Sequence, residues 1–378
     1  MKIHEYQAKE ILRTHGILTP QGIVVDRIDA RLSLAENFGF PLVVKAQIHV
    51  GGRGKAGAIR VVSNTRELQI GVAEILAMTV KGLKVKKVLI EKALNIKQQF
   101  YLGIIVDRLG QSNALVVSAS GGIDIEETAK SAPEKILRIL LDNPQKIEEE
   151  NLAQLASFLK LGSSISSCFI QIVRALFSAY ISLDTQLVEI NPLVLSNDNQ
   201  WIACDAKIII DDNALFRQKE LSVLKEEEED NLLEKEAHLR NLAYVKLNGN
   251  IGVIGNGAGL VMATMDEVKR AGGQPADFLD IGGGAKKEVV KNALEIIYMD
   301  KDVEGIFINI FGGITRCDEV ALGITGILEN APRNIPLVVR LSGTQCEKGR
   351  EILEHSNLIA VGNMEEGAKK IVSLVNKL

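Results

Sequence analysis

The second half of the chain repeats one pattern of apolar and polar positions five times. From Ile251 onward, a short β-branched apolar run leads to a glycine-bearing turn and then to a segment with helical spacing. The five apolar runs are Ile251–Ile254, Phe278–Ile281, Ile306–Ile310, Leu337–Leu341 and Leu358–Val361. This alternation predicts a doubly wound, largely parallel α/β sheet.

The glycine turns fall at one edge of this predicted sheet. Ligands of such sheets lie beyond the carboxyl ends of the strands, where helix N-termini present free N–H groups and a partial positive charge. For any single turn, a tight strand-to-helix connection is the better explanation. Several such turns in one domain favour an anion-binding rim, without indicating which anion it binds.

The first half of the chain has a different rhythm. An opening helix is expected from His4 to His15, ended by Gly16. The apolar runs that follow outnumber the helices between them, which favours an α+β domain with antiparallel strands. These runs are Leu42–Val44, Ala58–Val62, Val88–Ile90, Leu102–Val106, Ala114–Val117 and Leu187–Ile190. Leu215 to Tyr244 contains no glycine or proline and carries the acidic run Lys225–Asp230, so we expect a solvated connecting helix there.

The strongest local signal in the first half is a lysine followed by a glycine-rich loop. Lys45 lies in a β-branched run, and the glycines of the loop His49–Gly57 allow backbone N–H groups to approach phosphate oxygens. A basic surface hairpin is the alternative. However, a lysine in such a run is costly to bury unless an anion or a carboxylate meets it. The spacing excludes a Walker P-loop, which needs Gly-Lys-Ser or Gly-Lys-Thr.

Two polar residues lie on what we predict to be neighbouring strands. Leu187–Val194 and Trp201–Lys207, joined by a turn at Ser196–Asn199, would bring Asn191 and Asp205 close together. Such oxygen donors suit Mg²⁺, which keeps several waters and bridges nucleotide phosphates. On spacing alone, an ordinary polar strand end is the simpler explanation of each residue.

Composition and charge narrow the classes of function. The 378 residues exceed what one hydrophobic core supports, so two or more domains are expected. A net charge of −4, with no long basic stretch, argues against nucleic acid as a partner. The N-terminus lacks a signal-peptide core, and no apolar run approaches the roughly 20 residues of a membrane span. We therefore expect a cytoplasmic protein, or a matrix protein in a eukaryote. Four scattered cysteines disfavour a zinc site or a disulfide framework.

Taken together, these segments resemble the β subunits of the succinyl-CoA synthetases, ATP-grasp enzymes of the acyl-CoA synthetase group. The motifs occur in order along the whole chain: Met1–Lys9, His49–Gly57, Tyr101–Gly103, Glu189–Leu193, Asn213–Gln218, Leu247–Gly252, Asn256–Leu260, Phe278–Ala285 and Asn309–Asp318. The resemblance implies an ATP-grasp domain at 1–216, a connecting helix at 217–244 and a flavodoxin-like CoA-ligase domain at 245–378.

The resemblance also implies roles by position. Asn191 and Asp205 match the Mg²⁺ ligands, and Glu189 matches an acid that steadies a phosphohistidine at the nucleotide site. The residues at nucleotide-binding positions are Lys45, Gly52, Arg53, Gly54, Glu91, Leu94 and Gln99. Those in the segment that holds succinate and phosphate are Asn256, Gly313, Ile314 and Thr315.

The chain departs from the family pattern at several positions. Gln99 stands where a glutamate is frequent, so the charge is gone although the amide still accepts a hydrogen bond from a ribose hydroxyl. Leu94 replaces a polar residue, Ser120 a glutamate and Ala206 a glycine. These changes concern nucleotide affinity rather than reaction class. Pro20 matches ADP-forming members, which favours ATP over GTP.

The family reaction passes a phosphoryl group through a histidine, whose neutral imidazole is nucleophilic near physiological pH. The histidines of this chain are His4, His15, His49, His238 and His355. Only His49 lies beside a glycine loop, and none lies beside the Asn256 or Gly313 turns. In the family, this histidine and the main CoA site belong to an α subunit. The resemblance thus implies an αβ or α2β2 enzyme of the tricarboxylic acid cycle that converts succinate, CoA and ATP to succinyl-CoA, ADP and phosphate.

Three alternatives stay open at this stage. A malate–CoA ligase β subunit shares the architecture and differs in accepting one more hydroxyl on the diacid. A nucleotide-binding subunit without chemistry would account for Gln99, Ser120 and Leu94, although it has no need of the Asn191 and Asp205 pair. A single-chain ATP-grasp ligase acting as a homodimer conflicts with the missing histidine but not with the fold.

Overall fold

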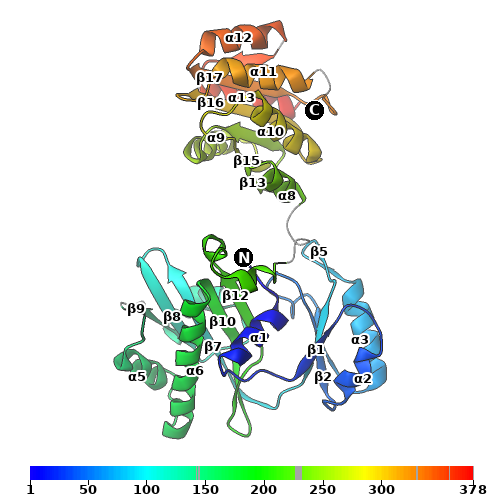
Figure 1. Ribbon diagram of the computed structural model, residues 1–378, viewed down its shortest axis with the longest axis vertical. Coiled ribbons are helices and arrows are strands. Elements are labelled where there is room, and N and C mark those ends of the chain that lie inside the picture. Colours follow the sequence, from blue (N-terminus) through cyan, green and yellow to red (C-terminus); the bar gives the residue numbers. More distant parts are fainter. Residues whose placement is uncertain (142, 144, 226–231, 329–330, 357, 378) are drawn as a thin grey trace. The chain divides into compact units, whose positions relative to one another are not determined.

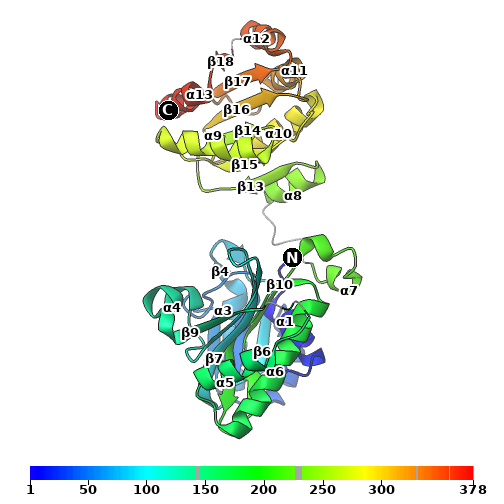
Figure 2. The same cartoon turned by 90° about the vertical axis from the view of Figure 1, so that its left-hand side faces the viewer.

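The computed structural model describes the whole chain except residues 142, 144, 226–231, 329–330, 357 and 378 (Figures 1 and 2). The chain folds into two units, Met1–Glu229 and Asp230–Leu378. The first unit is mixed α and β with two main sheets, and the second is built around one sheet.

The smaller main sheet of the first unit has four antiparallel strands and is covered by helices α2 (Arg31–Glu36) and α3 (Thr65–Ala77). Its strands, in spatial order, are β1 (Gly22–Val25), β6 (Val88–Lys92), β2 (Leu42–Ala46) and β3 (Ile59–Val62). Alternate side chains of β2 and β6 pack under α3 in one apolar core. A separate hairpin joins β4 (Thr79–Val80) to β5 (Leu83–Lys84).

The larger sheet of the first unit is also antiparallel. Its strands, in order, are β11 (Trp201–Ala203), β10 (Thr185–Ser196), β7 (Ile96–Asp107), β8 (Ser112–Ser118) and β9 (Ile136–Leu141), with β12 (Ala206–Ile210) paired to β10. Every apolar run predicted in this half coincides with a strand, except that Ala58 lies one residue before β3, and the α+β prediction is confirmed. The remaining elements are α4 (Ile125–Ser131), α5 (Glu149–Phe158), α6 (Ser163–Ser182) and the 3-10 turns Pro133–Lys135 and Asp212–Ala214.

The opening helix α1 (Glu5–Thr14) lies between the two sheets of the first unit (Figure 1). His4 begins it with a capping box, in which the side chain of Gln7 accepts a hydrogen bond from the His4 backbone N–H at 2.8 Å. Gly16, with φ of +82°, follows its end, so the predicted helix and its glycine stop are confirmed. Leu12 is fully buried in the core of the larger sheet.

Within the described residues, α6 is long and apolar enough to cross a membrane by length and composition alone, which the sequence reading did not anticipate. Phe169, Val173 and Leu176 on this helix are buried in the core beneath the larger sheet. A core helix passes the same test, so packing within the first unit explains the apolar character of α6.

The second unit has one six-stranded sheet. The strand order is β13 (Ala243–Lys246), β15 (Asp277–Asp280), β14 (Ile251–Gly255), β16 (Gly305–Gly312), β17 (Leu337–Gly343) and β18 (Ile359–Val361). The last five strands are parallel and follow the flavodoxin order 2-1-3-4-5, as predicted. Helices α10 (Lys287–Met299), α11 (Cys317–Leu328) and α12 (Cys346–His355) share one core, while α9 (Ala258–Arg270) and α13 (Met364–Val375) share another.

The prediction of one connecting helix at 217–244 is wrong for the described residues. Two short helices, α7 (Lys219–Ser222) and α8 (Leu232–Leu239), occupy the segment, and most of the acidic run lies outside the described residues. The segment then enters β13, an edge strand that pairs antiparallel with β15. Local composition gave no sign of β13, because its strand conformation depends on a partner more than thirty residues away.

Two glycines of α11, one packed against α10 and one facing open space, provide a matched pair of variants that tests the helix packing of the second unit. A Cβ at Gly323 would lie 2.7 Å from the backbone oxygen of Lys287, whereas one at Gly326 of the same helix would meet open space. We expect Gly323→Ala to lower the free energy of unfolding by about 1–3 kcal/mol, because two helix backbones must separate. Gly326→Ala should raise it by about 0.5–1 kcal/mol through helix propensity. Thermal and urea unfolding of both variants measure this, and equal effects would contradict the packing.

Candidate functional site

Six charged side chains meet in the interior of the first unit. They come from α1, β2, the glycine loop, β6 and the link between β11 and β12. The three cations are Lys9, Lys45 and Arg53, and the three carboxylates are Glu5, Glu91 and Asp205. We call these six residues the ionic cluster; its formal charges cancel.

Lys45 lies at the centre of the ionic cluster and is only 5% exposed. Its Nζ is 2.9 Å from Glu5 Oε1 and 2.9 Å from Glu91 Oε2, and it donates to the carbonyl of Cys204 at 2.7 Å. Burial alone would lower the pKa of Lys45, but Glu5 and Glu91 outweigh it and hold that pKa well above its usual value. The expectation that an anion or a carboxylate meets this lysine is therefore confirmed, and in this structure two carboxylates do so.

Lys9 and Glu5 belong to the ionic cluster but were missed as site residues in the sequence. Lys9 is 1% exposed, donates to both Glu91 oxygens at 2.6 and 2.8 Å, and lies 2.7 Å from Glu5 Oε1. The sequence does contain a signal for these two residues, because Glu5 and Lys9 fall on the same helical face as the apolar residues Ala8 and Leu12, which are buried. Charges on the apolar face of a helix indicate a buried polar site.

Arg53 turns inward from the glycine loop. Its Nη1 donates to Glu5 Oε2 at 2.6 Å and to the carbonyl of Ala46 at 3.0 Å, while its Nη2 donates to Asp205 Oδ2 at 2.6 Å. Gly52 and Gly54 on either side are exposed, and a Cβ on Gly54 would meet open space. The loop therefore offers bare backbone to a ligand while its arginine is held by two carboxylates.

The ionic cluster sets the protonation of its own acids. Burial raises the pKa of Glu5 on its own, but Arg53, Lys45 and Lys9 outweigh it and hold that pKa well below 4.5. Asp205 differs, since burial and the negative charge of Glu5 raise its pKa against the opposing effect of Arg53. Glu5 is thus a fixed anion, whereas Asp205 depends more on the cation beside it.

Asn191 and Asp205 lie together, as the strand pattern predicts. The Asn191 N–H donates to the Asp205 carbonyl at 3.2 Å. The Asn191 side chain reaches the turn after β8, where its Oδ1 accepts from Gly122 N–H at 2.7 Å and its Nδ2 donates to the Ile123 carbonyl at 2.9 Å. The Ser120-Gly121-Gly122 turn is thereby tied to this pair.

The donor set at this place suits Mg²⁺ bound together with phosphate. In the described part of the chain, no three or more His, Cys, Asp or Glu side chains form a metal-binding group. Asp205 and Asn191 offer carboxylate and amide oxygens, and Glu189 lies nearby on β10 with its pKa raised chiefly by burial. Mg²⁺ keeps several waters and bridges phosphates, so two protein oxygens fit it. When bound, it would neutralise phosphate charge.

Three further residues are predicted to bind the nucleotide: Glu91, Leu94 and Gln99. Glu91 belongs to it, whereas Leu94 is half-buried in the link between β6 and β7. Gln99 is exposed on β7 and close to Gly122, where a Cβ would lie 2.5 Å from Gln99 Oε1. Gln99 therefore borders the turn that Asn191 holds.

In the second unit, the turns after β14 and β16 meet at the point where the strand order reverses. Asn256 joins them: its Oδ1 accepts from Phe311 N–H at 2.9 Å, and its Nδ2 donates to the Phe311 carbonyl at 2.9 Å and to Thr315 Oγ1 at 3.1 Å. Thr315 Oγ1 also accepts from Gly284 N–H at 2.9 Å. Ligands of doubly wound sheets bind at this switch point.

Of the four residues predicted here, the structure joins two directly. Asn256 and Thr315 are hydrogen-bonded, while Gly313 and Ile314 lie on the exposed side of the turn, Ile314 with 85% of its surface open. A Cβ on Gly313 would meet open space. Backbone amides, an amide side chain and a hydroxyl of this turn can bind an anion by hydrogen bonds. The turn also contains the Asp280 carboxylate, which accepts from Gly257 N–H at 2.6 Å and from Gly282 N–H at 2.8 Å.

His4 and His15 cap the two ends of α1, and His49 begins the glycine loop. His4 and His49 pack edge to face in the first unit with ring centroids 4.3 Å apart. His238 is on α8, and His355 ends α12 with its Nδ1 near the Glu351 carbonyl at 2.5 Å. The side-chain contacts described for the Asn256 turn come from amide, hydroxyl and carboxylate groups, and these two histidines belong to helices outside it.

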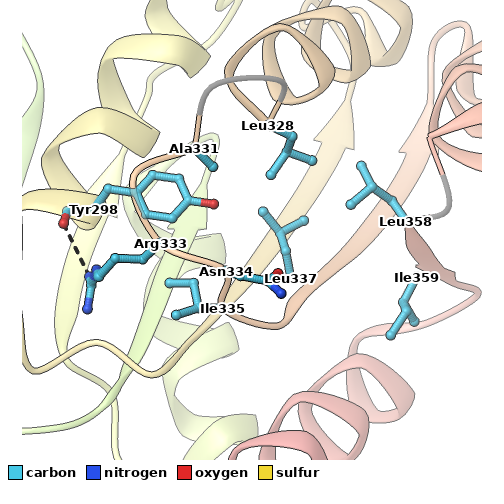
Figure 3. A pocket seen from close by; sticks show the side chains of 9 residues that line it. All are labelled: Tyr298, Leu328, Ala331, Arg333, Asn334, Ile335, Leu337, Leu358 and Ile359. Atoms are coloured by element: carbon cyan, nitrogen blue, oxygen red, sulfur yellow. Dashed lines mark hydrogen bonds between the residues drawn. The ribbon is translucent and has the colours of Figure 1, made fainter.

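A cavity of about 440 Å³ lies at the opposite edge of the second sheet, where β17 and β18 begin (Figure 3). The Tyr298 ring points into it, and Arg333 donates to the Tyr298 carbonyl at 3.2 Å. Leu328, Leu337 and Leu358 supply apolar walls. The Asn256 turn lies beyond the other ends of the strands, so this cavity is not part of that site.

Comparison with known proteins first defines the class. The family model described as ATP-grasp domain matches residues 2–195, and the one described as CoA-ligase matches residues 254–373. The structure of ATP citrate lyase from Methanothrix soehngenii in complex with citrate and coenzyme A has the same fold, with a TM-score of 0.69 and 20% identity over 100% of this chain and 99% of that one. The chain therefore combines an ATP-grasp domain with a CoA-ligase domain.

Full-length relatives then define the family. The Thermus thermophilus succinate–CoA ligase [GDP-forming] subunit beta is 46% identical over 99% of both chains. The Aquifex aeolicus [ADP-forming] subunit beta is 46% identical over 100% of both, and that of Desulfatibacillum aliphaticivorans is 44% identical over 99% of this chain and 100% of its own. The chain belongs to the succinate–CoA ligase β-subunit family.

The ionic cluster predicts a pH-dependent stability that one carboxylate controls. Glu5→Gln leaves three buried cations with two carboxylates and should cost about 3–5 kcal/mol at pH 7. Because the folded pKa of Glu5 is depressed, its contribution is complete above its ordinary pKa of 4.5 and is lost as the pH falls through the folded pKa. The difference from wild type in urea unfolding should therefore narrow below pH 4.5.

Glu10→Gln is the matched control, since Glu10 is on the same helix, exposed, and paired only at the surface with Arg13. It should change the free energy of unfolding by less than about 1 kcal/mol. An equal loss in both variants would mean that the ionic cluster is not what stabilises the first unit.

Proposed function

We propose that this chain is the nucleotide-binding β subunit of a succinate–CoA ligase. Together with an α subunit, it would reversibly couple succinate, CoA and ATP to succinyl-CoA, ADP and phosphate. The carrying observation is the coexistence, in one chain of this family, of two polar sites with different chemistry: the ionic cluster with Asn191, and the turn at Asn256, where amide and hydroxyl groups gather beside the Asp280 carboxylate.

The ionic cluster supports the nucleotide and metal roles. Lys45 and Arg53 provide cations beside the open backbone of Gly52 and Gly54, which suits the phosphates of ATP. Asn191 and Asp205 would hold Mg²⁺ against the same phosphates. Glu189 would steady an incoming phosphohistidine. Relatives include both GDP- and ADP-forming subunits, and the buried Pro20 is our basis for proposing ATP.

The turn at Asn256 and Gly313 supports the carboxylate and phosphate roles. Its exposed side carries Gly313 and Ile314, where backbone N–H groups could stabilise charge on a transferring phosphoryl group. The phosphorylated histidine and the main CoA site would come from the α subunit, in an αβ or α2β2 assembly in the cytoplasm.

The division of labour can be tested by reconstitution. The purified chain alone should give no ATP-dependent succinyl-CoA, whereas addition of a CoA-binding α subunit with a phosphohistidine should restore turnover with Mg²⁺. Substantial turnover by the chain alone would contradict the proposal and favour a single-chain ligase. Binding of Mg·ATP without phosphotransfer to the added subunit would indicate a subunit without chemistry, and faster turnover with malate than with succinate would indicate a malate–CoA ligase.

The phosphate role of the second unit can be tested at Gly313. A Cβ there meets open space and its backbone φ is not positive, so Gly313→Leu should fold normally and project a side chain into the exposed side of the turn. We expect turnover of the reconstituted pair to fall by about a hundredfold or more, as when an oxyanion donor is lost. ATP binding by calorimetry should be unchanged.

Gly326→Leu serves as the control, because Gly326 is also exposed with open space beside it and lies near the C-terminal end of α11, away from the turn. It should retain most of the turnover. Loss of ATP binding in Gly313→Leu would place the turn at the nucleotide site and contradict its assignment.

A further inference from the structure

Arg53 is hydrogen-bonded to Asp205, the carboxylate that the proposed function assigns to Mg²⁺. Its Nη2 lies 2.6 Å from Asp205 Oδ2, the distance of a strong charge-assisted hydrogen bond. A divalent cation that used the same oxygen would face the guanidinium charge at close range. Metal and Arg53 are therefore competitors for Asp205.

The charges of the ionic cluster explain why neither ligand enters easily alone. Three cations balance three carboxylates, so a free divalent cation adds two positive charges beside Arg53. A free nucleotide brings phosphates that need Arg53, whose removal would leave Asp205 uncompensated in a largely buried place. The metal complex of the nucleotide satisfies both needs: its cation compensates Asp205 and its phosphates compensate Arg53.

We propose that Asp205 exchanges Arg53 for the divalent cation, so that metal and nucleotide phosphate enter the site as one coupled unit. This inference rests on the proposed function and extends it to the order of events at the site. Arg53 acts as a placeholder counterion that keeps Asp205 paired before the ligand arrives. No covalent step is involved.

The surroundings allow Arg53 to move while the rest of the ionic cluster stays. Glu5 retains Lys9 at 2.7 Å and Lys45 at 2.9 Å after Arg53 leaves, so its charge remains compensated. Gly52 and Gly54 beside Arg53 are exposed, and the described loop places no atom within 3.9 Å of a Cβ on Gly52. The guanidinium can thus swing with the loop toward a bound phosphate, while Lys9 and Lys45 hold Glu5 in place.

The exchange makes a distinctive prediction for Arg53→Met, measured on the full-length chain. Binding of Mn²⁺ alone, by electron paramagnetic resonance of the free ion, should become tighter by about tenfold or more, because the competing cation is gone. Binding of ADP alone in EDTA, by calorimetry, should become weaker by a similar factor, because a phosphate partner is gone. A damaged site would weaken both.

Arg60→Met is the matched control. Arg60 is on β3 of the same unit and pairs with Glu74 at the surface, so this change removes the same charge and should alter neither affinity. Equal effects of Arg60→Met and Arg53→Met would mean that overall charge is responsible and would overturn the exchange. Unchanged or weaker Mn²⁺ binding in Arg53→Met would also overturn it.

Asp205→Asn separates this inference from the proposed function. The double variant Arg53→Met/Asp205→Asn should lose the gain in Mn²⁺ affinity, since the exchanged oxygen is no longer charged. If Asp205→Asn abolishes Mn²⁺ binding in the presence of ADP but Arg53→Met changes nothing, the exchange fails and the metal assignment survives. If Asp205→Asn binds Mn²⁺ as wild type does, both fail. Thermal unfolding checks that each variant is folded.

Discussion

The ionic cluster is the interaction on which the first unit depends. Six charges inside a protein cost several kcal/mol each unless they are paired and hydrogen-bonded, so each member restricts the positions of its partners. Lys9 connects α1 to β6, and Arg53 connects the glycine loop to the link before β12. The cost of burial therefore fixes how the opening helix, the two sheets and the loop meet. It also leaves strong cations beside a loop of bare backbone, which is what a polyphosphate requires.

The second unit reaches its site by topology rather than by charge. Because β14 has β15 on one side and β16 on the other, the strand order reverses between β14 and β16, and the turns after these two strands meet at this switch point. The Asn256 side chain joins the two turns with a donor and an acceptor to the Phe311 backbone. Gly343 permits close contact nearby, since a Cβ there would lie 1.9 Å from the Gly312 oxygen. The strand order thus brings the two turns to one point of the sheet, and the Asn256 amide connects them.

Most of the fold could be predicted from the periodicity of apolar residues. Burying one face of a helix or strand requires apolar residues at regular intervals, and these intervals are visible in a single sequence. The five strand–turn–helix units and the apolar runs of the first half follow from this periodicity, as does the need for carboxylates around Lys45. Contacts between distant segments left weaker traces. Glu5 and Lys9 look like ordinary helix charges until their face is compared with that of Leu12. Strand β13 forms because it pairs with β15. The inward orientation of the Arg53 side chain depends on its hydrogen bond to Asp205, which is 152 residues away.

The two sites treat negative charge in opposite ways, and this difference explains the proposed need for a partner. The first unit carries full positive charges on Lys9, Lys45 and Arg53, and carboxylates already neutralise these charges before any ligand binds. The turn at Asn256 offers dipoles beside the Asp280 carboxylate, and the nearby cations Arg316 and Lys348 are paired with Asp318. A phosphoryl group that left Lys45 and Arg53 for this turn would lose ionic compensation. Under the proposed function, the missing compensation would be supplied on the exposed side of Gly313 by a group of the α subunit, which would complete the site in both charge and chemistry.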